Sequence, residues 1–166
     1  MQLDISKIRS KPGSEINVEL EEDIGSISGR QVTFLKPVRL HGKMRNIDGD
    51  LYFQGDAVVV MELICDRCLK PYQETLDLVL DEIFYPEFKK VDDIDFYKTY
   101  NGNQLEMDQM IHDGVLLKIS MNSICQEDCL GLCAHCGADL NEGPCSCEVD
   151  EVDPRMEILK NLISEE

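Results

Sequence analysis

The eight cysteines of this 166-residue chain are its most chemically reactive side chains, and they fall into two segments. The first segment holds Cys65 and Cys68. The second segment holds the other six, namely Cys125, Cys129, Cys133, Cys136, Cys145 and Cys147. Thiolates separated by one to three residues can converge on one metal ion from a single tight loop. The spacing therefore predicts metal binding.

Zinc is the metal that we expect, because it binds four thiolates at tetrahedral corners with sulfur about 2.3 Å away. Eight cysteines predict two such sites. The expected local site is Cys133, Cys136, Cys145 and Cys147, with Gly137 permitting a turn and Gly143-Pro144 returning the chain. The other site would be Cys65, Cys68, Cys125 and Cys129, which requires a tertiary contact that spacing does not reveal. His135 is interpreted as a loop side chain, with a substitute ligand as the alternative.

The expected compartment is the cytoplasm, and no membrane is expected as a partner. No stretch approaches the roughly 20 apolar residues that cross a bilayer, and residues 1–10 lack the apolar run of a signal peptide. The cytoplasm is reducing, so metal binding or redox chemistry is favoured over disulfides. Four disulfides would be the alternative in an exported protein.

Enzymatic readings of the cysteines are less favoured. A redox Cys-X-X-Cys pair opens a helix in a βαβ setting, whereas Leu69-Lys70-Pro71 leads into a predicted strand. Closed four-cysteine sites are usually structural, while catalytic zinc keeps an open position. The sequence also lacks a phosphate-binding loop, a Gly-X-Ser-X-Gly elbow and a His-Glu-X-X-His motif. We expect no enzyme; a thiol-redox or metal-dependent enzyme, such as a nuclease, is the weakest alternative.

The elements that position the first cysteine pair are two predicted strands. Apolar and polar residues alternate over Leu51–Ile64 and over Tyr72–Tyr85. These strands should form an antiparallel hairpin with Cys65 and Cys68 at its tip. The other expectations are a strand at Met1–Ile8, a strand at Pro37–Asn46 with a hairpin loop at Asn46–Asp50, a bulge at Gly55 and an exposed loop at Lys89–Asn103.

Helical spacing follows at Leu105–Ile119, where Met107, Ile111, Val115 and Ile119 form one stripe, supported by Met110 and Leu117. A last helix is expected to begin at Asp153, with Asp as N-cap and Pro154 at the first helical position. The predicted fold class is α+β. It comprises a β-rich antiparallel domain of hairpins over residues 1–120, which could be barrel-like, with one packing helix. A cysteine-rich zinc module with a terminal helix follows over residues 121–166.

The net charge is −17, which disfavours nucleic acid at long range. Residues 25–47, however, contain no Asp or Glu. On the strand in that stretch, Arg39, His41, Lys43 and Arg45 share one face, and Arg67 lies at the hairpin tip. These five residues are the candidate RNA-binding surface, since basic side chains neutralise phosphates. The alternative is a solvated strand face that balances local acid.

Three blocks of this sequence, at residues 65–72, 129–141 and 153–156, resemble motifs of one known family. It is the bacterial and plastid YceD family of large ribosomal RNA subunit accumulation proteins. The segment at residues 65–72 resembles the family's Cys-X-Arg-Cys-Leu-X-Pro-Phe motif. The segment at residues 129–141 resembles its Cys-X-Gly-Leu-Cys-X-X-Cys-Gly-X-X-Leu-Asn block, and Asp153-Pro154-Arg155-Met156 resembles its closing helix. His135 stands where many members carry another residue.

The resemblance implies a role in accumulation or processing of large-subunit ribosomal RNA during ribosome assembly. It supplies neither a mechanism nor catalytic residues. The expected partner is large-subunit ribosomal RNA, or a ribosomal protein or assembly factor. In the second case the chain would be an acidic adaptor that binds a basic partner without direct RNA contact.

Overall fold

Two long strands, β6 (Asp50–Ile64) and β7 (Pro71–Pro86), form the centre of the fold. They pair antiparallel from Leu51↔Phe84 to Ile64↔Pro71. The computed structural model describes residues 1–27, 32–89 and 97–147. The predicted hairpin and the α+β class are confirmed, and Cys65 and Cys68 lie in the loop that joins the two strands.

The large sheet extends from this hairpin on both sides. Strand β5 (Val38–Ile47) pairs with β6, and β2 (Glu15–Glu22) pairs with β5. Beyond the start of β5, β4 (Val32–Phe34) pairs with β6, and β3 (Ser26–Ile27) pairs with β4. On the other side, β8 (Lys98–Tyr100) runs parallel to the end of β7. Among the described residues no strand pairing closes the sheet, so it is open rather than a barrel.

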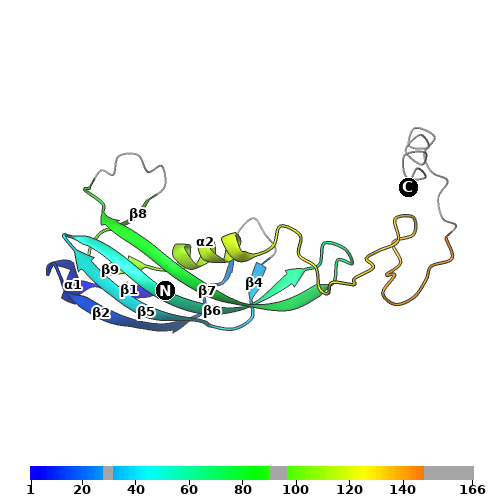
Figure 1. Ribbon diagram of the computed structural model, residues 1–166, viewed down its shortest axis with the longest axis horizontal. Coiled ribbons are helices and arrows are strands. Elements are labelled where there is room, and N and C mark those ends of the chain that lie inside the picture. Colours follow the sequence, from blue (N-terminus) through cyan, green and yellow to red (C-terminus); the bar gives the residue numbers. More distant parts are fainter. Residues whose placement is uncertain (28–31, 90–96, 148–166) are drawn as a thin grey trace, which may run out of the picture.

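The remaining elements cover one face of this sheet. They are a small sheet of β1 (Gln2–Asp4) and β9 (Gln104–Glu106), and the helices α1 (Ser6–Arg9) and α2 (Asp108–Lys118). Figure 1 shows α2 along the sheet, with the β6–β7 hairpin tip projecting past its end toward the cysteine-rich segment. The hydrophobic core lies between these layers and includes Phe53, Phe84, Met107 and Ile111.

The turn between β5 and β6 is a two-residue hairpin loop at Asp48 and Gly49. Both residues have positive φ, 53° and 96°, as the tight hairpin turn requires. Asn46, which is fully buried, accepts a hydrogen bond from the Gly49 N–H at 2.9 Å. Its side-chain amide donates to the carbonyl oxygens of Ile8 and Arg9 at 2.6 and 3.0 Å. This one side chain therefore fixes both the turn and the short helix α1.

The structure differs from the sequence expectations at several places. The predicted strand at Met1–Ile8 ends at Asp4 and gives way to α1, and the predicted loop at Lys89–Asn103 contains β8. The β5–β6 register continues through Gly55 without a bulge. Leu117 is 89% exposed and takes no part in the helix stripe, unlike Met110. The helix predicted from Asp153 lies outside the described residues.

Candidate metal centres

The eight cysteines lie in two groups of four, with the same membership that the spacing predicts. In each group the four sulfur atoms lie within 4.8 Å of one another. Site 1 consists of Cys65, Cys68, Cys125 and Cys129, and site 2 consists of Cys133, Cys136, Cys145 and Cys147. The tertiary contact that site 1 requires is therefore present.

The sulfur separations in site 1 fit a tetrahedral metal ion. Cys65 Sγ lies 3.9 Å from Cys129 Sγ, and Cys68 Sγ lies 3.8 Å from Cys125 Sγ. Four sulfurs about 2.3 Å from a central zinc ion are about 3.8 Å from one another. A disulfide bond would require about 2.05 Å. The donor set and its spacing thus fit zinc and exclude these pairs as disulfides.

The two Cys-X-X-Cys loops adopt the same backbone geometry. In site 1, the Cys65 carbonyl accepts the Leu69 N–H at 2.9 Å, and the Cys65 N–H donates to the Lys70 carbonyl at 2.9 Å. In site 2, the Cys133 carbonyl accepts the Gly137 N–H at 2.9 Å, and the Cys133 N–H donates to the Ala138 carbonyl at 2.8 Å. Each loop is a tight knuckle that presents two sulfurs on one side.

The residue after the second cysteine has positive φ in both knuckles. It is Gly137 in site 2, with φ of 70°, and Leu69 in site 1, with φ of 57°. Glycine adopts this conformation freely, whereas a leucine is disfavoured there because its Cβ approaches the backbone. The expectation that Gly137 permits the turn in site 2 is consistent with this geometry.

Hydrogen bonds to sulfur lower the pKa of one cysteine in each site. Burial raises the pKa of Cys65, but backbone N–H groups of Cys68, Cys125 and Arg67 outweigh this and lower it to about 6. Backbone N–H groups of Cys136 and His135 likewise lower the pKa of Cys133 to about 6.

Another thiol in each group resists ionisation. Burial, followed by the neighbouring thiols, raises the pKa of Cys125 to about 12. The thiol of Cys136, followed by burial, raises the pKa of Cys147 to about 12. Four adjacent thiols cannot all ionise without a compensating positive charge, which a divalent cation supplies.

The two sites differ in exposure. Cys65, Cys68 and Cys129 are buried at 0, 5 and 2% exposure, and Tyr72 and Ile124 pack against them. In site 2, Cys136 is exposed and Cys145 and Cys147 are half-buried. Site 1 therefore forms a small core of its own at the hairpin tip. Site 2 lies at the surface of the cysteine-rich tail, which is the segment after α2 (residues 121–147).

Polar contacts join the hairpin tip to the tail. The Asp66 carboxylate accepts the Ser123 N–H at 2.7 Å, and the Asp66 N–H donates to the Ser123 carbonyl at 2.7 Å. The Arg67 guanidinium donates to the Cys129 carbonyl at 2.8 Å. Lys70 Nζ lies 2.6 Å from carboxylate oxygens of both Asp139 and Glu142. These contacts hold the two halves of site 1 together independently of a metal.

Asn141 is a supporting residue that the reasoning from spacing missed. Its Oδ1 accepts the Leu130 N–H at 2.8 Å, and its Nδ2 lies 3.6 Å from Cys129 Sγ. It orients a site 1 ligand from the segment between the two pairs of site 2 cysteines. Asn141 does stand in the block that resembles the YceD family, which was the available signal.

The predicted RNA-binding residues lie where the alternation placed them, but they are not isolated. Arg39, His41, Lys43 and Arg45 are on the uncovered sheet face, with side chains 52–74% exposed. Each faces a carboxylate of the neighbouring strand β2, and the contact distances run from 3.1 to 3.9 Å. The pairs are Arg39–Glu21, His41–Glu19, Lys43–Glu15 and Arg45–Glu15. Arg67 lies apart from them, at the hairpin tip.

Comparison with known proteins finds a family profile and several relatives. The sequence profile described as "Large ribosomal RNA subunit accumulation protein YceD" matches residues 53–163. An uncharacterized protein of Mycobacterium tuberculosis (strain ATCC 25618 / H37Rv) is 25% identical over 100% of this chain and 83% of its own length. An uncharacterized protein of Mycobacterium leprae is 24% identical over 97% of this chain and 76% of its own length.

A plant protein shares a shorter segment. It is the "Large ribosomal RNA subunit accumulation protein YCED homolog 1, chloroplastic" of Arabidopsis thaliana, 37% identical over 36% of this chain and 18% of its own length. No solved structure matches this chain. Within the described residues, no helix has the length and apolar character needed to span a membrane. Because the family profile covers more than half of the sequence, the chain belongs to the YceD family of large ribosomal RNA subunit accumulation proteins.

Proposed function

We propose that this protein is a non-enzymatic cytoplasmic factor that supports the accumulation of large-subunit ribosomal RNA and binds two structural zinc ions. The YceD family name supports the role in ribosomal RNA accumulation. The closed arrangement of four cysteines at each site supports a non-enzymatic role. Four thiolates around one zinc ion leave no position for a substrate or an activated water molecule.

The zinc ions would stabilise the module rather than act on RNA. The thiolates of site 1 would bind zinc between the β6–β7 hairpin tip and the segment that follows α2. The thiolates of site 2 would bind a second ion within the tail. Residues 1–120 would then be the β-rich domain, and residues 121–166 the zinc module that docks on its tip through Cys65 and Cys68.

The geometry best supports binding of this chain to ribosomal proteins or assembly factors, without direct contact with RNA. One observation carries this interpretation. Every basic side chain on the exposed face of β5 faces a carboxylate of β2, so this surface has little net positive charge to attract phosphates. The net charge of −17 instead attracts basic proteins, which are abundant on ribosomes.

Direct RNA contact is the second candidate, and the exposure of the same ion pairs favours it. Pairs at this exposure contribute only about 0–1 kcal/mol, so a phosphate can displace a carboxylate from Arg39 or Lys43 at little cost. Arg67 would have to give up its hydrogen bond to Cys129. The two candidates differ in whether RNA is needed for binding.

Ultraviolet cross-linking in cells, followed by sequencing of the attached RNA, separates the candidates. Co-purification with ribosomal proteins after RNase treatment, without discrete RNA sites, supports contact through proteins. Discrete sites on large-subunit ribosomal RNA, lost when Arg39 and Lys43 are both changed to Glu, support direct contact. Depletion of the protein with no fall in large-subunit relative to small-subunit ribosomal RNA would contradict the proposed function as a whole.

A further inference from the structure

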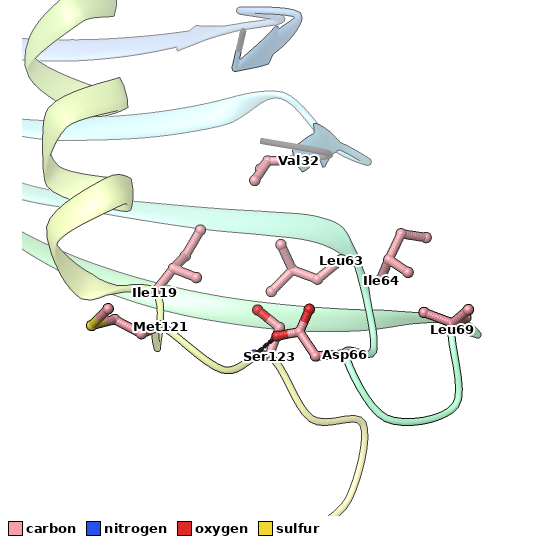
Figure 2. A pocket seen from close by; sticks show the side chains of 8 residues that line it. All are labelled: Val32, Leu63, Ile64, Asp66, Leu69, Ile119, Met121 and Ser123. Atoms are coloured by element: carbon pink, nitrogen blue, oxygen red, sulfur yellow. Dashed lines mark hydrogen bonds between the residues drawn. The ribbon is translucent and has the colours of Figure 1, made fainter. Parts of the chain in front are cut away.

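A cavity of about 280 Å³ lies beside site 1, between the sheet and the hairpin tip. Its apolar walls come from β4, from the end of β6 and from the segment after α2. Its lining residues are Val32, Leu63, Ile64, Asp66, Leu69, Ile119, Met121 and Ser123. Figure 2 shows Asp66 and Ser123 together, with Leu63 and Ile119 opposite them and with Met121 and Leu69 on the two flanks.

The two flanking side chains are unusually exposed for apolar residues. Leu69 is 62% exposed and Met121 is 89% exposed, while Leu63 and Ile119 behind them are buried. An apolar floor with protruding apolar flanks is the arrangement of a surface that receives another apolar group. Exposed methionine adapts readily to the shape of what it contacts.

Leu69 has a backbone conformation that a glycine would adopt without strain. The equivalent residue of site 2 is Gly137, and both have positive φ. The apolar residues that pack against the buried thiols of site 1 are Tyr72 and Ile124, so Leu69 has no part in that cluster. The knuckle sets this positive φ at both positions, but it does not require a leucine there. An exposed leucine at a position that favours glycine points to a use of its side chain outside the fold.

Asp66 gives the cavity a charge. One of its oxygens accepts the Ser123 N–H, and among the described residues no other group bonds this carboxylate. An occupant therefore brings an apolar side chain for the cavity and a positive group for Asp66. The excess of acidic residues in the whole chain acts in the same direction.

We propose that this cavity is a docking site for a basic protein, which inserts one apolar side chain between Leu69 and Met121 and places an adjacent lysine or arginine on Asp66. The proposal rests on the proposed function only in its choice of a basic protein over other cationic partners. The site is separate from the basic strand β5, and its occupation leaves both groups of thiolates undisturbed.

The test places the photoreactive amino acid benzoylphenylalanine at position 121 of the full-length protein in cells. Position 130 is the matched control, because Leu130 is 67% exposed but lines a different cavity, with Leu140 and Pro144. We expect a protein adduct at position 121 that is absent at position 130. The cross-linked peptide should carry an apolar residue next to lysine or arginine.

Leu69→Gly provides the decisive variant. It removes the side chain and relieves the backbone, so zinc content should stay unchanged and the melting temperature should stay or rise, while the adduct at position 121 falls at least about tenfold. Leu130→Gly should leave the adduct intact. A synthetic peptide of the cross-linked sequence should bind the wild type and weaken by a similar factor for Leu69→Gly.

Four results would overturn the docking site: no adduct at position 121, an equal adduct at position 130, an adduct with RNA alone, or a lower melting temperature for Leu69→Gly. The last would assign Leu69 to the fold. These failures are distinct from failure of the proposed function, which is read from ribosomal RNA levels. A confirmed adduct with a basic protein unrelated to ribosomes would support the docking site, while the proposed function would still be decided by the ribosomal RNA levels.

Discussion

Gly42 of β5 and Gly55 of β6 lie directly opposite each other in the sheet, and the ring of Phe53 lies against both. A Cβ atom on Gly42 would come within 2.8 Å of Phe53 Cζ and 2.5 Å of the Gln54 carbonyl oxygen. A Cβ atom on Gly55 would collide with the His41 carbonyl oxygen. The two strands therefore approach each other closely because both positions lack a side chain.

Gly55→Ala is accordingly expected to destabilise the protein by about 1–3 kcal/mol, because the two nearest atoms, the His41 carbonyl oxygen and Gly42 Cα, are backbone atoms that cannot move aside. Urea denaturation followed by circular dichroism measures this. Val58→Ala, on the open face of the same strand, should cost much less. Equal losses for the two variants would show that the close approach carries no special cost.

Zinc content should be about two ions per chain, with four thiolates for each. Elemental analysis of protein purified under reducing conditions measures it. Cys68→Ser and Cys136→Ser should each lower the content to about one ion, because they affect different sites. Protein with no zinc and eight titratable thiols would exclude both metal sites.

The two sites should also release zinc at different rates. In site 2, Cys136 is exposed and Cys145 and Cys147 are half-buried, whereas three of the four cysteines in site 1 are buried. A chelator with a colorimetric zinc readout should therefore remove one ion quickly and the other slowly. In Cys136→Ser only the slow phase should remain, and in Cys68→Ser only the fast phase. A single phase in the wild type would contradict this ordering.

Gly137→Leu places a leucine at positive φ in site 2, at the position equivalent to Leu69 in site 1. We expect a cost of about 1–2 kcal/mol, because an L-residue with a side chain is disfavoured at this φ. The open space around Gly137 means that no steric clash adds to it. A zinc-affinity measurement by competition with a chelator reports the cost. Unchanged affinity would show that the knuckle tolerates a side chain freely.

The ion pair between Arg39 and Glu21 should contribute less than about 1 kcal/mol to stability, because both side chains are more than half exposed. A double-mutant cycle with Arg39→Gln and Glu21→Gln measures it. The Glu21→Gln variant should raise affinity for a large-subunit ribosomal RNA fragment if β2 masks the strand. An unchanged affinity for the RNA fragment at low salt would mean that the exposed face of β5 does not contact RNA.

The sequence predicted the parts of this protein that depend on local pattern. Period-two alternation defined β5, β6 and β7 to within two residues, since side chains of these strands alternate between core and solvent. Cysteine spacing predicted both groups of four, because a tight loop with two thiols has few other uses. Even site 1, which joins distant segments, followed by subtraction once Cys133, Cys136, Cys145 and Cys147 were assigned together.

Features that depend on register between distant strands were not predictable in the same way. The residues of β5 indicate a basic face, but only the pairing of Glu15, Glu19 and Glu21 against it reveals the neutralisation. The sequence indicates a bulge at Gly55, because local pattern does not reveal that Gly42 lies opposite it. Leu117 fitted the helical stripe by spacing, yet α2 turns it away from the sheet.

Site 1 imposes an order on how this protein is made. Cys65 and Cys68 precede β7, β8, β9 and α2 in the chain, and Cys125 and Cys129 follow them. Until Cys125 has left the ribosome, the hairpin tip has only two of the four thiolates of site 1, and the set is complete only once Cys129 has followed. Completion of this site therefore reports that the sheet and the helix between the two halves have been synthesised and have come together.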